Sequence, residues 1–211
     1  MITGRIKGFE YGVDETFQYL INLYNPVIYA SIHAESIDDP LVTSFVRVYN
    51  VNPCNVVASK YIVENPDCDI WSGGDKCYRY ASMFYHIKNG FDLVQNSGVH
   101  FDYVIRWRAD IKPSAPFVLP ESPKNNVVYI PKATSHYDNC PADWVPDQYA
   151  VGTMPSMQLY SATYTNLFDF YAKYNIGLNI PEQTLYNHIT KHGVSWEWGA
   201  PWDYTINPDR F

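Results

Sequence analysis

The first 112 residues alternate short apolar runs, which are typical of strands, with segments that have the spacing of amphipathic helices. Strands are predicted at residues 2–7, 27–32, 55–63 and 101–112. Helices are predicted between them at residues 17–24, 41–49 and 76–89. Each helix would carry the chain back to the edge where the next strand begins, which makes neighbouring strands parallel. The pattern predicts an α/β fold with a central, mostly parallel mixed sheet flanked by helices.

The pattern changes after residue 112. Prolines separate short apolar runs at 117–119 and 127–130, and a further short strand is expected at 149–152. Helices are predicted at 156–174 and 181–192, followed by a strand at 194–198. Because no repeat, linker or low-complexity tract divides the 211 residues, we expect one domain with a front half of about 1–112 and a rear half of about 113–211.

Composition limits the partners of such a domain. Apolar residues make up 46% of the chain and the formal net charge is -7, which disfavours a nucleic acid or an anionic membrane as the main partner. A phosphorylated small ligand remains possible, because a divalent cation can neutralise it. The 19 Tyr and 6 Trp suit sugar rings and nucleobases, although they suit a large core equally well. No signal peptide, membrane-length apolar run or Cys-x-x-Cys pair is found, so we expect a cytoplasmic protein with reduced thiols and no membrane insertion.

Charge is concentrated at the end of the fourth predicted strand, in the sequence FDYVIRWRADIK. Arg106, Arg108 and Asp110 alternate with Trp107 and Ala109, so an extended strand would place the three charges on one face. The carboxyl end of a central strand is where α/β sheets bind ligands. Arginine there would suit an oxyanion, and an aspartate would suit a metal ion. The alternative is a structural Arg–Asp pair that closes the strand.

Two further groups are candidates for a nucleotide site. Thr3, Gly4 and Arg5 lie in the first strand, where a glycine permits close backbone approach and an arginine can bind a phosphate or a base edge. Arg79 lies in the first turn of the third helix, near free N–H groups that favour anions. An ordinary strand and a solvated helix end are the alternatives. The fingerprints of dinucleotide-binding and P-loop proteins, G-x-G-x-x-G and G-x-x-x-x-G-K-[ST], are absent.

In the rear half, Asp147 and Gln148 precede a short apolar run in the sequence DWVPDQ. A carboxylate and an amide beside a tryptophan can hold sugar hydroxyls, and the carboxylate can act as a general base. The alternative is a turn, since Asp and Pro favour turns. Glu182 follows Pro181 at the start of a predicted helix, where an acidic residue is expected on electrostatic grounds alone.

These segments resemble the GT-A type of nucleotide-sugar glycosyltransferase. That family has a Rossmann-like front half, and an Asp-x-Asp element at the end of a central strand that holds Mn²⁺ or Mg²⁺ against the diphosphate. Arg108-Ala109-Asp110 occupies the equivalent place, with Arg108 in the position of the first aspartate. The Asp147-Gln148 pair is similar to the Asp-Gln on the sugar side of several members. The whole chain also resembles the amino-terminal transferase domains of large algal-virus proteins that build glycans, which would make it the front of a longer chain in the host cytoplasm.

The resemblance implies a metal-assisted transfer of a sugar from a UDP-linked or similar donor to a glycan hydroxyl. Asp110 would bind the metal, and Arg108, with Arg79, would stabilise the leaving diphosphate. Thr3, Gly4 and Arg5 would line the nucleotide in the front half, while the rear half would shape the sugar and acceptor site.

Several alternatives to this assignment stay open. Asp147 and Gln148 would contact the transferred sugar or activate the acceptor, with inversion and retention both possible. One alternative to a transferase is a non-catalytic nucleotide- or carbohydrate-binding domain. A nucleotidyltransferase is a further alternative, disfavoured because the loop GFEYG after the first strand is acidic and aromatic rather than basic.

Overall fold

The computed structural model describes residues 1–60, 75–130, 141–174, 180–199 and 204–208. The strands are β1 (Ile2–Gly4), β2 (Ala30–Ile32), β3 (Val56–Ala58), β4 (Val104–Arg106), β5 (Ile111–Pro113), β6 (Val127–Ile130), β7 (Ala150–Gly152), β8 (Ser195–Trp198) and β9 (Tyr204–Ile206). The α-helices are α1 (Val13–Thr16), α2 (Asn22–Tyr24), α3 (Pro40–Val48), α5 (Asp75–Asn96), α6 (Met154–Ser161), α7 (Thr163–Tyr174) and α8 (Pro181–Lys191). A 3-10 turn at Phe9–Gly12 and a π-helical turn at Phe17–Ile21 flank α1, and another 3-10 turn lies at Pro53–Asn55.

The main sheet is built from two hydrogen-bonded groups of strands. Strands β1, β2 and β3 are parallel neighbours, and β4, β7, β6 and β8 follow one another in a mixed group. The groups are joined where the end of β4 pairs in parallel with β1. There Trp107 donates its backbone N–H to Met1 over 2.9 Å and accepts from Thr3 over 3.1 Å. The strand order across the whole sheet is therefore β3-β2-β1-β4-β7-β6-β8.

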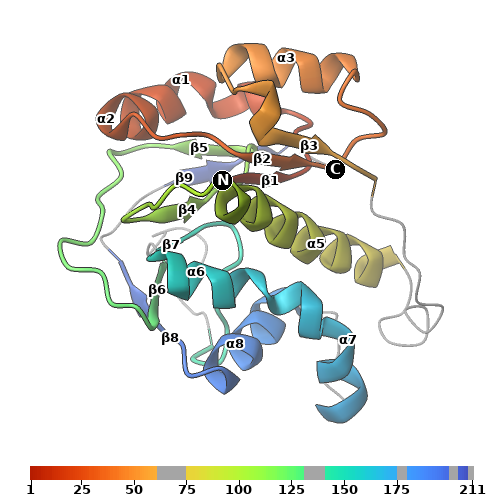
Figure 1. Cartoon of the computed structure of the whole chain (residues 1–211), viewed down its shortest axis with the longest axis vertical. Helices are drawn as coiled ribbons and strands as arrows, with labels where there is room; N and C mark the ends of the chain where they lie inside the picture. The colour runs from red at the N-terminus through yellow and green to blue at the C-terminus, as the bar shows by residue number, and fades with distance from the viewer. Residues whose placement is uncertain (61–74, 131–140, 175–179, 200–203, 209–211) are drawn as a thin grey trace.

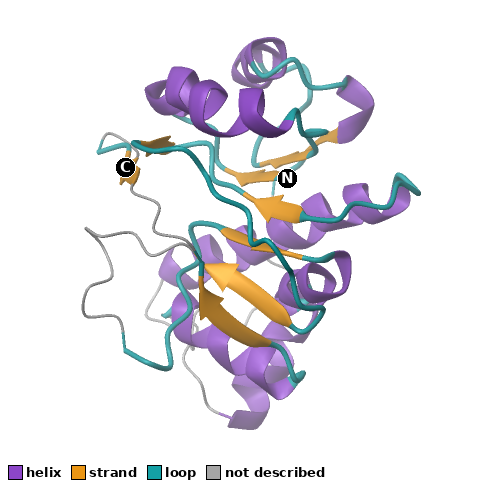
Figure 2. Cartoon of the chain, turned by 90° about the vertical axis from the view of Figure 1, so that its left-hand side faces the viewer, coloured by secondary structure: helices purple, strands orange, loops and turns teal. Residues whose placement is uncertain are grey.

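Helices cover both faces of the sheet, as Figure 1 shows, with α1, α2 and α3 above β1–β3 and α5 below them. In the view of Figure 2, the strands follow one another down the molecule with helices at the top and behind. Side chains alternate accordingly. Ile2 and Ile32 face a core that includes Phe9 and Phe45, whereas Val104 faces a second core with α5 and α6. This confirms the prediction of an α/β fold with a mixed sheet flanked by helices.

The charged segment 101–112 is not one strand, which corrects the prediction that its three charges share a strand face. β4 ends at Arg106, and Ala109 and Asp110 form a turn before β5. The turn is fixed from both sides. Ile111 donates its N–H to the carbonyl of Arg108 over 3.4 Å, and Asn207 donates to the carbonyl of Asp110 over 2.9 Å. The second contact draws the chain into a two-stranded antiparallel sheet of β5 and β9.

Other boundaries differ in ways that local chemistry explains. The helix predicted at 156–174 is two helices, because the chain turns at Ala162 and the Thr163 hydroxyl donates to the carbonyl of Tyr160 over 2.8 Å. The first strand stops at Gly4 rather than residue 7, since Gly4 has φ 96° and leaves the extended conformation. The end of the strand predicted at 55–63 lies outside the described residues beyond Lys60.

Candidate active site at the sheet switch point

The strand order creates one topological switch point. From β1 the chain moves outward to β2 and then β3, and α5 afterwards carries it back to β4 on the opposite side of β1. Connections therefore leave β1 and β4 in different directions, and the edge beyond their carboxyl ends is where open α/β sheets usually bind ligands. Gly4 ends β1 at this edge, and Arg106 ends β4 beside it. The sequence candidates around both residues thus meet at the place where such sheets bind ligands.

Gly4 leaves open space beside the backbone at the end of β1. Its φ of 96° is a conformation that side chains other than glycine rarely adopt, and no heavy atom lies within 4 Å of the position that a Cβ would take. Its carbonyl accepts from the backbone N–H of His33 over 3.0 Å, so the strand end is held in place. Arg5 next to it is exposed. The backbone at Gly4 is therefore open to close approach, and the ligand-binding role of Thr3, Gly4 and Arg5 stays a prediction.

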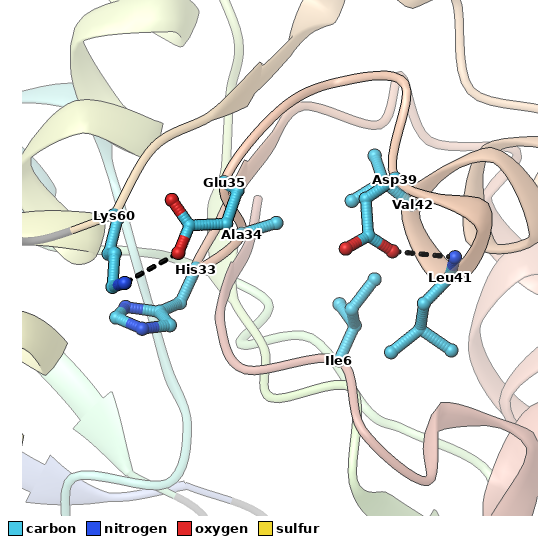
Figure 3. Close-up of a pocket in the computed structure, with 8 residues that line it drawn as sticks. All are labelled: Ile6, His33, Ala34, Glu35, Asp39, Leu41, Val42 and Lys60. Atoms are coloured by element: carbon cyan, nitrogen blue, oxygen red, sulfur yellow. Dashed lines mark hydrogen bonds and ion pairs between the residues drawn. The ribbon is translucent and has the colours of Figure 1, made fainter.

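A pocket of about 170 Å³ opens beyond β2 and β3 (Figure 3). Its polar side chains come from the segment after β2 and from Lys60 after β3, and Ile6, Leu41 and Val42 supply its apolar wall. Lys60 and Glu35 form an exposed ion pair with 2.5 Å between Nζ and Oε1. The residues that line the pocket are Ile6, His33, Ala34, Glu35, Asp39, Leu41, Val42 and Lys60.

His33 is held in a fixed orientation within this pocket. Its Nδ1 lies 3.2 Å from the Ser82 hydroxyl of α5, and its ring meets His86 edge to face at 5.6 Å between centroids. Burial lowers the pKa of His33, with further lowering by the positive charges of Arg5 and Lys60 and a smaller opposing effect of Glu35. A neutral imidazole that lines a pocket can donate or accept one hydrogen bond. Sequence reasoning missed His33, although its place directly after a predicted strand was a usable signal.

Asp39 has a structural role at the pocket rim. It is the N-cap of α3, and its Oδ1 accepts from the backbone N–H of Leu41 over 2.8 Å. It therefore shapes the pocket through the helix that it starts.

Arg108 and Asp110 form a two-point ion pair at the end of β4. Arg108 Nε donates to Asp110 Oδ1 over 3.0 Å and Nη2 to Oδ2 over 2.6 Å. The Asp110 side chain is 8% exposed and that of Arg108 is 22% exposed. Both predicted site residues are thus brought together, in the Arg–Asp arrangement that the sequence analysis had given as the structural alternative.

Arg106, the first of the three charges expected on one strand face, is buried. Its Nε donates to Thr3 Oγ1 over 3.3 Å and its Nη1 donates to the backbone carbonyl of Asp147. Burial lowers the pKa of Arg106, whereas electrostatic interactions with Tyr160, Asp147 and Asp110 raise it. Through these two hydrogen bonds the guanidinium connects β4 with β1 and with the loop before β7. Its signal in the sequence was an arginine inside an otherwise apolar strand.

Asp147 and Gln148 lie at the same edge, because β7 runs antiparallel to β4 and Ala150 pairs with Arg106. Both are buried, at 5% and 8% exposure. The loop that carries them is fastened to the start of α8. Val145 donates its N–H to the carbonyl of Glu182 over 3.1 Å.

Glu182 is the most perturbed carboxyl of the site. Burial and, to a smaller extent, the negative charge of Asp147 raise its pKa to about 7, against smaller lowering effects of its own backbone N–H and Arg108. Tyr80 of α5 belongs to the same group of charges, since burial, Glu182 and Asp147 raise its pKa and Arg79 lowers it. Arg79 itself is exposed near the start of α5. Sequence reasoning had assigned Glu182 to helix electrostatics alone.

Two kinds of site find no support in the part of the chain that the structure describes. No three His, Cys, Asp or Glu side chains in it are grouped so that they could hold a metal ion by themselves. Likewise, none of the helices within residues 1–60, 75–130, 141–174, 180–199 and 204–208 has the length and apolar character needed to cross a membrane.

Comparison with known proteins yields a weak structural likeness. No protein-family model matches the sequence, and no curated protein matches it. Among solved structures, the nucleoside-diphosphate-sugar pyrophosphorylase from Vibrio cholerae RC9 is similar to 99% of this chain and 95% of its own, with 12% identity and a TM-score of 0.48. A likeness at this level does not identify the reaction of this chain.

Proposed function

We propose that this protein is a glycosyltransferase that moves a sugar from a nucleoside-diphosphate sugar, UDP-linked by preference, to a glycan hydroxyl. The observation that carries the proposal is the arrangement at the switch point. The open backbone of Gly4, the pocket beside His33, the Arg108–Asp110 pair and Asp147 lie at one edge of the sheet, and Glu182 lies next to the loop that carries Asp147. A nucleotide, a diphosphate and a sugar need such a series of subsites.

The nucleotide would lie against the end of β1 and in the pocket of Figure 3. Gly4 would allow close approach of the ligand to the backbone, and the exposed Arg5 and Arg79 would offer positive charge. Thr3 would contribute indirectly, because its hydroxyl is occupied by Arg106. His33 and Lys60 are the pocket side chains able to bind polar groups of a base or ribose.

The diphosphate would lie beside the Arg108–Asp110 pair. Arg108 has a planar guanidinium that binds phosphate oxygens as readily as the carboxylate it now holds. With Arg108 on the diphosphate, Asp110 would offer a carboxylate oxygen as a hard ligand for Mn²⁺ or Mg²⁺. One carboxylate fits such an ion, because diphosphate oxygens and water fill the rest of an octahedral shell. The ion would supply positive charge opposite the leaving group.

Asp147 and Gln148 would contact the transferred sugar or the acceptor. Both lie in the loop before β7, next to the end of β4 where the diphosphate is proposed to sit. A carboxyl in this place is compatible with an inverting reaction, in which a base takes the acceptor proton. Retention would require no such base.

One feature favours sugar transfer over the synthesis of a nucleotide sugar. A nucleotidyltransferase is expected to have an open, basic loop after its first strand. Here that segment forms the compact 3-10 turn Phe9–Gly12, and a Cβ on Gly12 would lie 2.5 Å from the carbonyl of Ile111. The turn is therefore packed on β5 rather than free to close over phosphates.

The proposal is tested by calorimetric titration of nucleotides and nucleotide sugars with and without Mn²⁺, followed by transfer assays with glycan acceptors. Binding of one nucleoside-diphosphate sugar, strengthened by Mn²⁺, and release of the nucleoside diphosphate on transfer support it. Release of pyrophosphate from a nucleoside triphosphate and a sugar phosphate would favour a nucleotidyltransferase. Nucleotide binding without turnover would favour a non-catalytic binding domain.

A further inference from the structure

A pocket of about 230 Å³ opens at the edge of the sheet where β1, β2 and β4 begin. Tyr29 directly precedes β2, Tyr103 directly precedes β4, and both line the pocket. Tyr24 of α2 lines it from above the sheet and Val94 of α5 from below, in the view of Figure 1. Because β1, β2 and β4 run parallel, this edge is opposite to the one where Gly4 ends β1. The proposed transfer gives this pocket no role.

Aromatic rings form much of the pocket wall, and they come from Tyr24, Tyr29, Phe101 and Tyr103. Two of the tyrosine hydroxyls are already used in hydrogen bonds to the backbone. Tyr24 donates to the carbonyl of Phe117 over 2.8 Å, and Tyr103 donates to the carbonyl of Pro120. Tyr24 and Tyr103 therefore offer a ligand the carbon atoms and π-electrons of their rings rather than a hydroxyl proton.

The other two rings, of Tyr29 and Phe101, stand nearly at right angles. Their planes differ by 79°, with 6.0 Å between the ring centroids. Tyr29 is 5% exposed, and its hydroxyl has no hydrogen-bond partner in the part of the chain that the structure describes. A polar atom of such a buried residue beside a cavity is expected to bind water or a ligand. The pocket is therefore mainly apolar and aromatic, with a single tyrosine hydroxyl open to a ligand.

The charge of the pocket is negative. Asp102 is exposed and lines it, and no lysine, arginine or histidine is among the described residues that form its wall. Asp102 lies close enough to act on the rings, because its charge adds to the effect of burial in raising the pKa of Tyr103. The amine of Met1, which also lines the pocket, donates to the carbonyl of Ile105 over 2.5 Å. Burial and, to a smaller extent, Arg106 lower the pKa of this amine to about 5, so it is uncharged at neutral pH.

We propose that this pocket binds a small organic cation, whose alkylated ammonium group lies among the four rings with its positive charge towards Asp102. Aromatic faces attract such cations, and a quaternary ammonium has no N–H group that would need an acceptor. A cavity of about 150 Å³ holds benzene, so this pocket has room for a cation of the size of choline. A sugar ring fits less well, because its hydroxyls need several hydrogen-bond partners and two of the three tyrosine hydroxyls are already used.

The first test compares choline with 3,3-dimethylbutan-1-ol, which has the same shape without the charge, by calorimetric titration of the whole chain. We expect saturable binding of choline and binding of the neutral alcohol that is at least about tenfold weaker, because cation–π and carboxylate interactions are lost. Equal affinities for the two compounds would overturn the proposal and show an apolar pocket that does not recognise charge. Absence of choline binding would overturn it as well.

Variants place the binding in this pocket. Asp102→Asn removes the charge from an exposed side chain and should weaken choline binding about fivefold or more, while the urea midpoint stays that of the wild type. Phe101→Leu keeps an apolar side chain but removes one ring, and should also weaken choline binding. The matched control is Asp38→Asn, which removes an exposed carboxylate from the segment after β2 and should leave the choline Kd unchanged. An unchanged choline Kd in Asp102→Asn would overturn the proposal.

A free ion and the head group of a lipid could both supply a trimethylammonium group. Co-sedimentation with phosphatidylcholine vesicles that free choline reverses would identify a lipid head group as the ligand. Choline binding by protein that does not sediment with the vesicles would identify a free ion. The donor Kd of Asp102→Asn should equal that of the wild type, because the two sites lie at opposite edges of the sheet. Failure of the transferase proposal therefore leaves this one standing, and the reverse also holds.

Discussion

Arg106 on β4 donates a hydrogen bond from Nε to Thr3 Oγ1 on β1 over 3.3 Å, across the switch point of the sheet. Both residues are almost fully buried, at 1% and 4% exposure. The guanidinium also binds the Asp147 carbonyl, so one side chain connects the two central strands with the loop that brings Asp147 to the site. The stability of the site therefore depends on the buried charge of Arg106.

Removal of this arginine is expected to destabilise the protein strongly. Arg106→Ala leaves a cavity and two buried acceptors without a donor, which lowers the free energy of unfolding by about 2–4 kcal/mol. Thr3→Val, which keeps the side-chain shape and removes only the hydroxyl, should lower it by about 1 kcal/mol. Urea unfolding measures both. Equal midpoints for Arg106→Ala and wild type would show that the contact has no energetic weight.

Gly4 is expected to matter for ligand approach as well as for backbone geometry. Gly4→Ala strains a backbone at φ 96° and places a methyl group in the open space of the proposed nucleotide site, so donor affinity should fall by about tenfold, or about 1.4 kcal/mol. Gly98→Ala is the matched control, because Gly98 has φ 68°, has no heavy atom near its Cβ position and follows α5 at the opposite edge of the sheet. Both variants should lose about 1 kcal/mol of stability. Calorimetry should show weakened donor binding for Gly4→Ala alone; equal affinities would remove Gly4 from the site.

Asp110 is expected to carry the metal dependence of donor binding. Asp110→Asn should abolish the increase in donor affinity that Mn²⁺ gives to the wild type, because the amide is a poor ligand for a hard cation. Asp92→Asn breaks a different ion pair, with Lys88 on α5 at 2.6 Å, and should leave that increase intact. Titrations with and without Mn²⁺ measure the difference. A Mn²⁺ effect retained in Asp110→Asn would exclude Asp110 as the metal ligand.

Glu182 is expected to make stability fall as pH rises. The folded carboxyl has a pKa of about 7 against an ordinary value of 4.5, so between these pH values the folded protein holds a proton that the unfolded chain has lost. Glu182→Gln should therefore be more stabilising at pH 8 than at pH 4.5, by about 1 kcal/mol once solvent screening of this half-buried group is considered. Urea unfolding of both proteins at the two pH values gives the difference. If Glu182→Gln changes the free energy of unfolding by the same amount at pH 4.5 and pH 8, the raised pKa is contradicted.

His86 is expected to make stability fall as pH falls, which is the opposite of the effect of Glu182. Burial, with a smaller effect of His33, lowers its pKa to about 4 from an ordinary 6.5, so the unfolded chain takes up a proton that the folded protein refuses. The stability linked to His86 is present above pH 6.5 and is lost as pH falls towards 4, by about 2 kcal/mol.

The buried bond between Ser31 and His86 Nδ1, at 2.9 Å, allows a test. His86→Gln should be less stable than wild type at pH 8 but should lose less stability on acidification to pH 4.5. The exposed His100→Gln should follow the wild type at both pH values. Thermal unfolding across this pH range measures all three proteins, and an identical acid dependence of wild type and His86→Gln would contradict the lowered pKa.

The sequence predicted the class of fold because periodicity reports which side of an element is buried. Strand and helix patterns in the front half predicted β1, β2 and α3 within three residues, and Asp39-Pro40 marked the start of α3. The start of α5 was predicted within one residue, but the helix continues to Asn96 instead of ending at residue 89. The same patterns predicted wrong boundaries where the chain turns because of a contact with residues far away in the sequence. The split of the segment after Arg106 depends on Asn207, which pairs with the turn from the other end of the chain.

The candidate site shows the same division. Thr3, Gly4, Arg5, Arg108, Asp110, Asp147 and Gln148 were identified from the sequence because charged or small residues at strand ends depart from the apolar pattern. Their partners were decided by the tertiary structure. Glu182 is an ordinary first-turn acid in the sequence, and only the packing of α8 against the loop of Asp147 buries it and shifts its pKa. Local propensity acts within a few residues, whereas burial and charge act through space, and the sequence alone does not give those distances.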